Sequence, residues 1–151
     1  MTSITRRVAL VRRPVGQVLP DDFSVDDVEL EELQDGQLRV AVEYISVDAG
    51  TRTMLRGEGF HMQVGLGETV RASGVGRVVA SKAEGWEIGQ AVKGGFGAQT
   101  MASVDARHVA AVDDTLGPLS LHLGVLAGST GVTAWVGTRE DVVTAGLLGP
   151  T

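Results

Sequence analysis

Short apolar runs separated by glycines and other turn-forming residues recur along the chain. In the strand-like run at residues 38–47, large apolar residues alternate with other residues from position 38 to position 44, the period of two that is typical of a half-buried strand. The apolar positions of this run are Leu38, Val40, Val42 and Tyr44, and the intervening ones are Arg39, Ala41 and Glu43. Further strand-like runs occupy residues 8–11, 28–33, 74–81, 90–94, 98–104 and 108–112. This pattern predicts a mainly β protein, a barrel or a sandwich.

Turn-forming residues fit between these runs. Asp35-Gly36 predicts a tight turn, and residues 94–97 predict a sharp corner. Few helices are expected. Asp48 can cap a short helix that runs through Leu55, and residues after Pro118 predict a second one that Gly128 would end.

The composition suits one folded domain. The chain has 151 residues, of which 43% are hydrophobic and 21% charged, enough apolar side chains for a packed core. It lacks an apolar stretch long enough to span a membrane and an N-terminal signal segment, so we expect a cytoplasmic protein with no membrane partner. The net charge of −6 and the scarcity of aromatic residues make nucleic acid an unexpected partner.

Metal and nucleotide motifs are not apparent. The chain has no cysteine, and its three histidines have no metal-ligand spacing. The stretch GVGRVV at residues 74–79 superficially suggests a dinucleotide fingerprint, but it lacks the third glycine and its valines favour a strand. We therefore expect no metal site, and we interpret these glycines as strand-bending positions.

Two segments contain candidate catalytic side chains. Asp48 and Arg52 are four residues apart in the predicted first helix, where they could form a local ion pair or contact a substrate. His61 lies in a glycine-rich loop close in sequence to Glu68, and its imidazole suits acid–base chemistry near neutral pH, although a lone loop histidine is more often an ordinary surface residue. His122 is expected to be a helix residue with a satisfied ring nitrogen.

Several ordered segments together resemble a known family. They are RRPVG at 12–16, YISVDAGTR at 44–52, LGETVRASGVGRVVAS at 66–81, GWEIGQAV at 85–92, LGPLSLHLGVLA at 116–127 and TGVTAWVG at 130–137. Their order and spacing resemble the zinc-free medium-chain dehydrogenases/reductases, in particular the branch of the prostaglandin and 2-alkenal reductases. The resemblance covers residues 10–137.

The resemblance implies a GroES-like, partly open β-barrel with a few short helices, spanning residues 1–137. In the family this barrel forms one wall of the substrate cleft, and an NADP-binding Rossmann domain follows it. Residues 138–151 are too few for a βαβ unit, which needs about 30 residues, so we expect a short tail there. Where zinc-bearing relatives have a GHE-type segment, this chain has Gly67-Glu68.

The resemblance also implies which residues contact the substrate, with two departures. Tyr44, Thr133 and Trp135 are predicted to contact a small-molecule substrate. The family's usual VDPYMR is Val47 to Arg52 with alanine and glycine in place of the proline and tyrosine, which would widen the cleft. The usual PGLTAY segment, beside the nicotinamide in relatives, is residues 130–135 here.

Three hypotheses of function follow from this sequence. In the first, the chain is the substrate-side half of an NADP-dependent enone or alkenal reductase, which binds no cofactor alone and needs a nucleotide-binding partner chain. In the second, the barrel is a cofactor-independent cyclase or isomerase on a polyketide-like substrate, or a ligand-binding protein. The third is an inactive remnant. The candidate catalytic residues are His61, Asp48, Arg52, Glu68 and Arg71.

The surface that a Rossmann domain would cover is expected to be apolar. Exposed apolar patches of this kind mark interaction sites, and we expect this one to form a two-fold homodimer or to bind a separate nucleotide-binding chain. Its residues are Leu123, Val125, Leu126, Trp135, Val136, Leu147 and Leu148.

Overall fold

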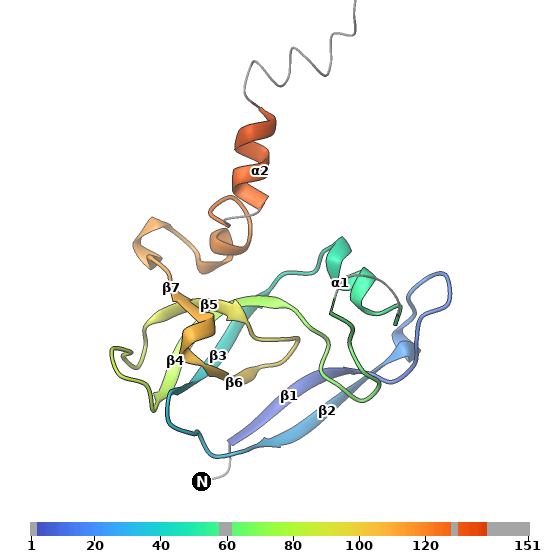
Figure 1. Cartoon of the computed structure of the whole chain (residues 1–151), viewed down its shortest axis with the longest axis horizontal. Coiled ribbons are helices and arrows are strands. Elements are labelled where there is room, and N and C mark those ends of the chain that lie inside the picture. The colour runs from blue at the N-terminus through green and yellow to red at the C-terminus, as the bar shows by residue number, and fades with distance from the viewer. Residues whose placement is uncertain (1–2, 58–61, 128–129, 139–151) are drawn as a thin grey trace, which may run out of the picture.

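The computed structural model describes residues 3–57, 62–127 and 130–138. These residues are mainly β, as the sequence predicts, and they curl into a partly open barrel (Figure 1). The strands are β1 (Ser3–Leu10), β2 (Phe23–Leu30), β3 (Gln37–Ile45), β4 (Ser73–Ser81), β5 (Ala91–Gly95), β6 (Met101–Asp105) and β7 (Val109–Ala111). The α-helices are α1 (Ala49–Met54) and α2 (Thr130–Gly137).

The strands form two antiparallel sheets. The larger sheet has the order β6-β3-β4-β5-β7, and β1 pairs with β2 in the smaller one. The other edge of β1 bonds to the loops of the larger sheet: Val8 N donates to the Ala98 carbonyl at 2.8 Å, and Thr100 N donates to the Arg6 carbonyl at 2.9 Å. The β1–β2 hairpin therefore closes one side of the curled sheet.

The core lies on the concave side of the larger sheet. It contains Leu38, Val40, Val78, Val92, Phe96 and Ala102, all almost inaccessible to solvent. Burying a side chain of this size contributes about 1.5–3 kcal/mol. A second cluster, which includes Leu55 of the α1 end and Val70, fills the space between α1 and β1. These two clusters fix the junction of β3 and α1 in space.

The period of two in residues 38–47 holds only for the first half of the strand. Arg39 was expected on the polar face but is buried, because its Nη2 donates to the Glu31 carbonyl at 2.5 Å and residues before β3 cover it. Tyr44 was expected on the apolar face but is 49% exposed. A register shift between Val42 and Tyr44 turns the end of β3 away from the core.

The boundaries of two other strands were also wrong. β2 lies at Phe23–Leu30 instead of residues 28–33, and β1 begins at Ser3 instead of Val8. The two strands pair along their whole length, from Ser3 with Leu30 to Leu10 with Phe23. This pairing makes the polar residues between these ends part of each strand, although their sequence does not predict a strand. Ion pairs across the hairpin, such as Arg6 Nε to Asp27 Oδ1 at 2.8 Å, accompany these charged positions.

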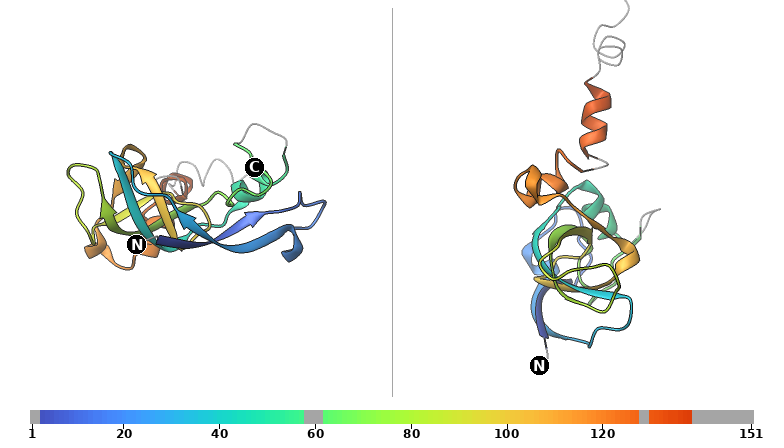
Figure 2. Two further views of the ribbon diagram at one scale, coloured as in Figure 1. Left: turned by 90° about the horizontal axis from the view of Figure 1, so that it is seen from below. Right: turned by 90° about the vertical axis from the view of Figure 1, so that its left-hand side faces the viewer.

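The helices were predicted less well than the strands. α1 is confirmed, with Asp48 as its N-cap. The helix expected after Pro118 is only a 3-10 turn, Leu119–Leu123, capped by Gly124; Gly128 lies outside the described residues. α2 was not predicted as a helix and projects from the barrel (Figure 2). No helix within the described residues is long and apolar enough to cross a membrane.

Candidate functional site

Asp48 lies at the junction of β3 and α1, where three cavities meet. Its Oδ1 accepts a hydrogen bond from Thr51 N at 3.0 Å, which satisfies one of the free N–H groups at the start of α1. The same residue lines three cavities. The Asp48 carboxylate is thus held in place by the cap of α1 and forms part of the wall of more than one cavity.

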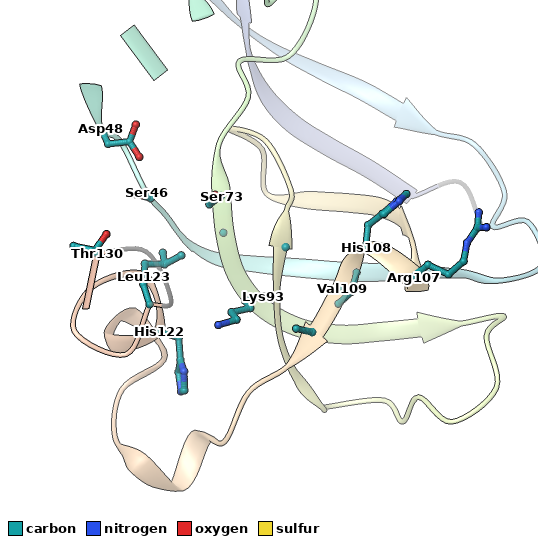
Figure 3. Close-up of a pocket in the computed structure, with 14 residues that line it drawn as sticks. Ser46, Asp48, Ser73, Lys93, Arg107, His108, Val109, His122, Leu123 and Thr130 are labelled. Carbon is teal, nitrogen blue, oxygen red and sulfur yellow. The ribbon is translucent and has the colours of Figure 1, made fainter. Parts of the chain in front are cut away.

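The first of these, which we call the Lys93 cavity, has a volume of about 470 Å³ (Figure 3). Its walls are formed by the residues after β3, the start of β4, part of β5, the start of β7 with the two residues before it, and the segment from the 3-10 turn Leu119–Leu123 to the start of α2. Its polar side chains come from Ser46, Asp48, Ser73, Lys93, Arg107, His108, His122 and Thr130. A cavity of this size can hold a small organic molecule.

Lys93 provides positive charge to this cavity. Its side chain is half-buried and extends toward the segment that carries His122 and Leu123 (Figure 3). Within the described residues it forms no hydrogen bond and no ion pair. Arg107 differs, because its Nη2 lies 2.6 Å from Asp105 Oδ2 and this hydrogen bond lowers the pKa of Asp105 well below its usual range. The charge of Lys93 is thus not neutralised by a described carboxylate.

His122 is buried at the edge of the Lys93 cavity and has a structural partner. Its Nε2 donates to the Asp113 carbonyl at 3.0 Å, which confirms the prediction of a satisfied ring nitrogen. The Asp113 side chain accepts hydrogen bonds from the hydroxyl and the N–H of Thr115, and these lower the pKa of the carboxyl group. The bond from His122 holds the 3-10 turn to the residues that follow β7.

The second space, the Arg71 cavity, has a volume of about 350 Å³. It brings together Asp48 and Arg71, two of the predicted catalytic residues, with Thr51 and Gln99 also in its wall. Arg71 Nη1 lies 3.7 Å from Met62 Sδ, a weak contact. Asp48 and Ser73 line both this cavity and the Lys93 cavity, so the two are adjacent.

Arg52 does not pair with Asp48, contrary to the ion pair that their spacing predicts. Arg52 Nη2 instead donates to the Gly16 carbonyl at 2.6 Å, and the Asp48 carboxylate is engaged in capping. The β1–β2 hairpin loop supplies this carbonyl, which the local sequence around α1 could not reveal.

The structure gives Glu68 a role in its own loop. Glu68 Oε2 accepts from Gly65 N at 2.8 Å and closes a tight turn, and the residue lines neither the Lys93 cavity nor the Arg71 cavity. His61 lies outside the described residues. Its predicted acid–base role remains a prediction.

The three predicted substrate contacts are not brought together. Tyr44 lines a shallow groove beside β1 and neither of the two cavities. Thr133 and Trp135 are on α2, where Trp135 is 63% exposed. Neither lines the Lys93 cavity, which α2 reaches only through Thr130.

Lys93 and the two serines of the Lys93 cavity were missed by the sequence analysis. Lys93 is in the short strand QAVKG, where a lysine is unremarkable. Ser46 and Ser73 are 27 positions apart, yet Ser46 N donates to the Ser73 carbonyl at 2.8 Å. Only the pairing of strand ends brings these residues together, and the local sequence contains no signal for it.

The described residues do not form a nucleotide-binding unit. All strand pairings among them are antiparallel, whereas a dinucleotide is bound by a parallel βαβ unit with a helix N-terminus at the pyrophosphate. The stretch at residues 74–79 lies within β4, as predicted. The described residues also contain no group of three or more side chains arranged to hold a metal ion.

Comparisons with known proteins agree with this architecture. A family model described as the N-terminal domain of oxidoreductase matches residues 6–112. Prostaglandin reductase 1 of Oryctolagus cuniculus is 31% identical over 129 residues, which is 83% of this chain and 35% of that protein. The NADPH-dependent curcumin reductase of Escherichia coli (strain K12) is 28% identical over 154 residues, which is 96% of this chain and 44% of that protein.

A solved structure resembles the fold over most of the chain. The crystal structure of CurA from Vibrio vulnificus superimposes with a TM-score of 0.79 at 27% identity and covers 88% of this chain and 39% of that one. The chain thus spans less than half the length of these relatives. This match agrees with the GroES-like, partly open barrel.

Proposed function

Since this chain belongs to the family of oxidoreductase N-terminal domains, we propose that it is the substrate-side half of an NADP-dependent reductase of enones and alkenals. The observation that carries the proposal is the match over residues 6–112, which include the strands that build the Lys93 and Arg71 cavities. Two relatives that match most of this chain are named as reductases, one of them NADPH-dependent.

This chain would bind the substrate but not the cofactor. Reduction needs a hydride donor held against the substrate, and the described residues do not form a site for a dinucleotide. NADP therefore belongs to a nucleotide-binding unit, either elsewhere in a longer polypeptide or on a separate chain. No cofactor-binding residue is assigned here.

Lys93 is the residue to which we assign the main chemical role. When hydride adds to the carbon–carbon double bond of an enone, negative charge develops on the carbonyl oxygen. A fixed cation within a partly enclosed site stabilises such charge more than water does. Lys93 is suited to this role because no described carboxylate neutralises it. Lys93 would bind the carbonyl oxygen and thereby lower the activation free energy of the hydride addition.

Asp48 and Arg71 are assigned to positioning of the substrate. Asp48 is shared by the Lys93 and Arg71 cavities and is held by its bond to Thr51 N. Arg71 supplies hydrogen-bond donors to the second cavity, where a further carbonyl or hydroxyl group of the substrate could bind. The cofactor-independent cyclase, isomerase and ligand-binding alternatives gain no support from the relatives.

We propose that the exposed apolar side chains of α2 and of the segment before it contact the nucleotide-binding unit. Val125, Val132, Trp135 and Val136 are between 43% and 68% exposed. Leu123 instead packs partly against the core, and Leu147 and Leu148 lie outside the described residues. Without that unit, a second copy of the chain would cover the same surface.

A domain exchange tests the proposed function. Residues 1–137 would replace the equivalent region of the E. coli NADPH-dependent curcumin reductase, and NADPH consumption would be followed with 3-nonen-2-one. The chimera should reduce the enone, and K93M should lower kcat by at least about tenfold, or about 1.4 kcal/mol. K82M is the matched control, because Lys82 is the other lysine of the chain and does not line either cavity; it should retain full activity.

Two results would contradict the proposal. One is a folded chimera that binds NADPH but does not reduce the enone. The other is tight NADPH binding by the purified chain alone, seen as a saturable rise in Tm, together with turnover of the enone.

A further inference from the structure

The wall of the Arg71 cavity contains two methionines that differ in exposure. Met54, at the end of α1, is partly buried, whereas Met62 is 71% exposed. Met101 of β6 is partly buried as well and lines none of the three cavities beside Asp48. Among the methionines that the structure describes, Met62 is therefore the one that a dissolved oxidant reaches most readily.

The sulfur of Met62 lies beside a guanidinium group. Arg71 Nη1 donates to Met62 Sδ across 3.7 Å. Within the described residues this is the one hydrogen bond of the Arg71 side chain, which forms no ion pair there. A thioether is a weak acceptor and a guanidinium is a strong donor, so the two groups are poorly matched. An oxygen atom added to this sulfur would give Arg71 a much stronger acceptor.

Peroxides add such an oxygen to a thioether. A lone pair of the sulfur attacks one oxygen of the peroxide, the O–O bond breaks, and the transferred oxygen gives its proton to the hydroxide or alkoxide that leaves. The sulfur is oxidised by two electrons to a sulfoxide, and the peroxide is reduced to water or to water's alcohol counterpart. The sulfoxide oxygen carries partial negative charge, which a guanidinium N–H stabilises.

We propose that Met62 is a site of reversible oxidation by peroxides and that Arg71 binds the sulfoxide formed there. The modified side chain would engage Arg71 and add a polar group to the wall of the Arg71 cavity. The modification itself does not depend on the proposed reductase function. Its effect on substrate binding does rest on that function, because a substrate group would have to compete with the sulfoxide for the donors of Arg71.

Peptide mass spectrometry of the purified chain during treatment with hydrogen peroxide tests the site of oxidation. Met62 should gain one oxygen atom at least about threefold faster than Met54 and Met101, because it is the most exposed of the three. In urea, where the fold protects none of them, the three rates should become similar. The proposal is overturned if Met54 or Met101 is oxidised as fast as Met62 in the folded chain.

Nuclear magnetic resonance of the isotopically labelled chain tests the bond to Arg71. The Nε–H signal of Arg71, identified by its loss in R71M, should shift when Met62 is oxidised and return after treatment with methionine sulfoxide reductases. The shift should be absent in M62L and present in M101L, the matched control. An Arg71 signal that stays unchanged once Met62 carries an oxygen atom would also overturn the proposal.

The chimera with the E. coli reductase tests the effect on the substrate. Peroxide treatment should raise the KM for curcumin, an enone with a second carbonyl group for Arg71, by about threefold, the value of one exposed hydrogen bond. The KM for 3-nonen-2-one, which has one carbonyl group, should not change, and M62L should abolish the effect on curcumin. An active chimera whose KM for curcumin is unaffected would overturn this effect. A chimera without activity would contradict the proposed function, while the mass and resonance measurements still decide the modification site.

Discussion

Gly76 of β4 lies directly against the backbone of Ala41 in β3. A Cβ atom at Gly76 would be 2.0 Å from the Ala41 carbonyl oxygen and 2.9 Å from its carbonyl carbon. The register of β3 shifts on both sides of this contact. The glycine therefore permits two strands to cross closely where the sheet curls.

G76A should destabilise the barrel strongly. The contact is with backbone, which cannot move aside like a flexible side chain, so we expect a loss of about 3 kcal/mol in the free energy of unfolding. Urea denaturation would measure it. G95A is the control, because a Cβ at Gly95 of β5 meets no atom within 4 Å. Equal stability of G76A and G95A would show that the close approach is not required.

The cap of α1 gives a second prediction. D48A removes the acceptor of Thr51 N and should lower the free energy of unfolding by about 1 kcal/mol. D48N and D48S retain a side-chain oxygen at this position and should lose much less. Thermal unfolding of the three variants side by side would measure the difference. If D48A is as stable as D48N, the capping bond contributes nothing measurable.

Asp22 predicts a dependence of stability on acid pH. Its buried carboxylate accepts from Leu19 N at 2.8 Å and from Arg12 Nε at 2.9 Å, and these bonds lower its pKa below the ordinary value of 3.8. Because the pKa is lower in the folded state, the stabilisation is complete above pH 3.8 and is lost as the pH falls through the lowered pKa.

D22N should therefore be less stable than the unmodified protein at neutral pH, and the gap should narrow as the pH is lowered. Urea denaturation at a series of pH values would measure this gap. R12M keeps the bond from Leu19 N, so its pH dependence should lie between the two. A gap between D22N and the unmodified protein that stays constant with pH would argue against this role for Asp22.

The apolar surface of α2 predicts self-association when no nucleotide-binding unit covers it. The double substitution V132Q/V136Q should raise the dimer dissociation constant by at least about tenfold, since burial of a valine contributes about 1.5 kcal/mol or more. V15Q, at a 94% exposed valine before β2, is the control and should not change it. Sedimentation velocity would measure both. A chain that stays monomeric at micromolar concentration would rule out the homodimer.

The sequence by itself determined the fold class and most of the local structure. Alternating residues such as Leu38 and Val40 are apolar because one face of β3 is buried, and Asp48 caps α1 with a bond three residues away. Both signals are local, so they can be read without the rest of the chain. The family resemblance, which rests on several ordered motifs, agreed with the match over residues 6–112.

Only the tertiary structure decided which side chains share a cavity. Lys93 and Asp48 line the same cavity because β3, β4 and β5 lie side by side in the sheet. Arg52 donates to the Gly16 carbonyl, 36 positions away, and not to Asp48. β2 extends through Asp26 and Asp27 because β1 pairs with it along its whole length. Such partners are distant in sequence, and their contacts depend on register and packing, which the spacing of residues along one segment cannot specify.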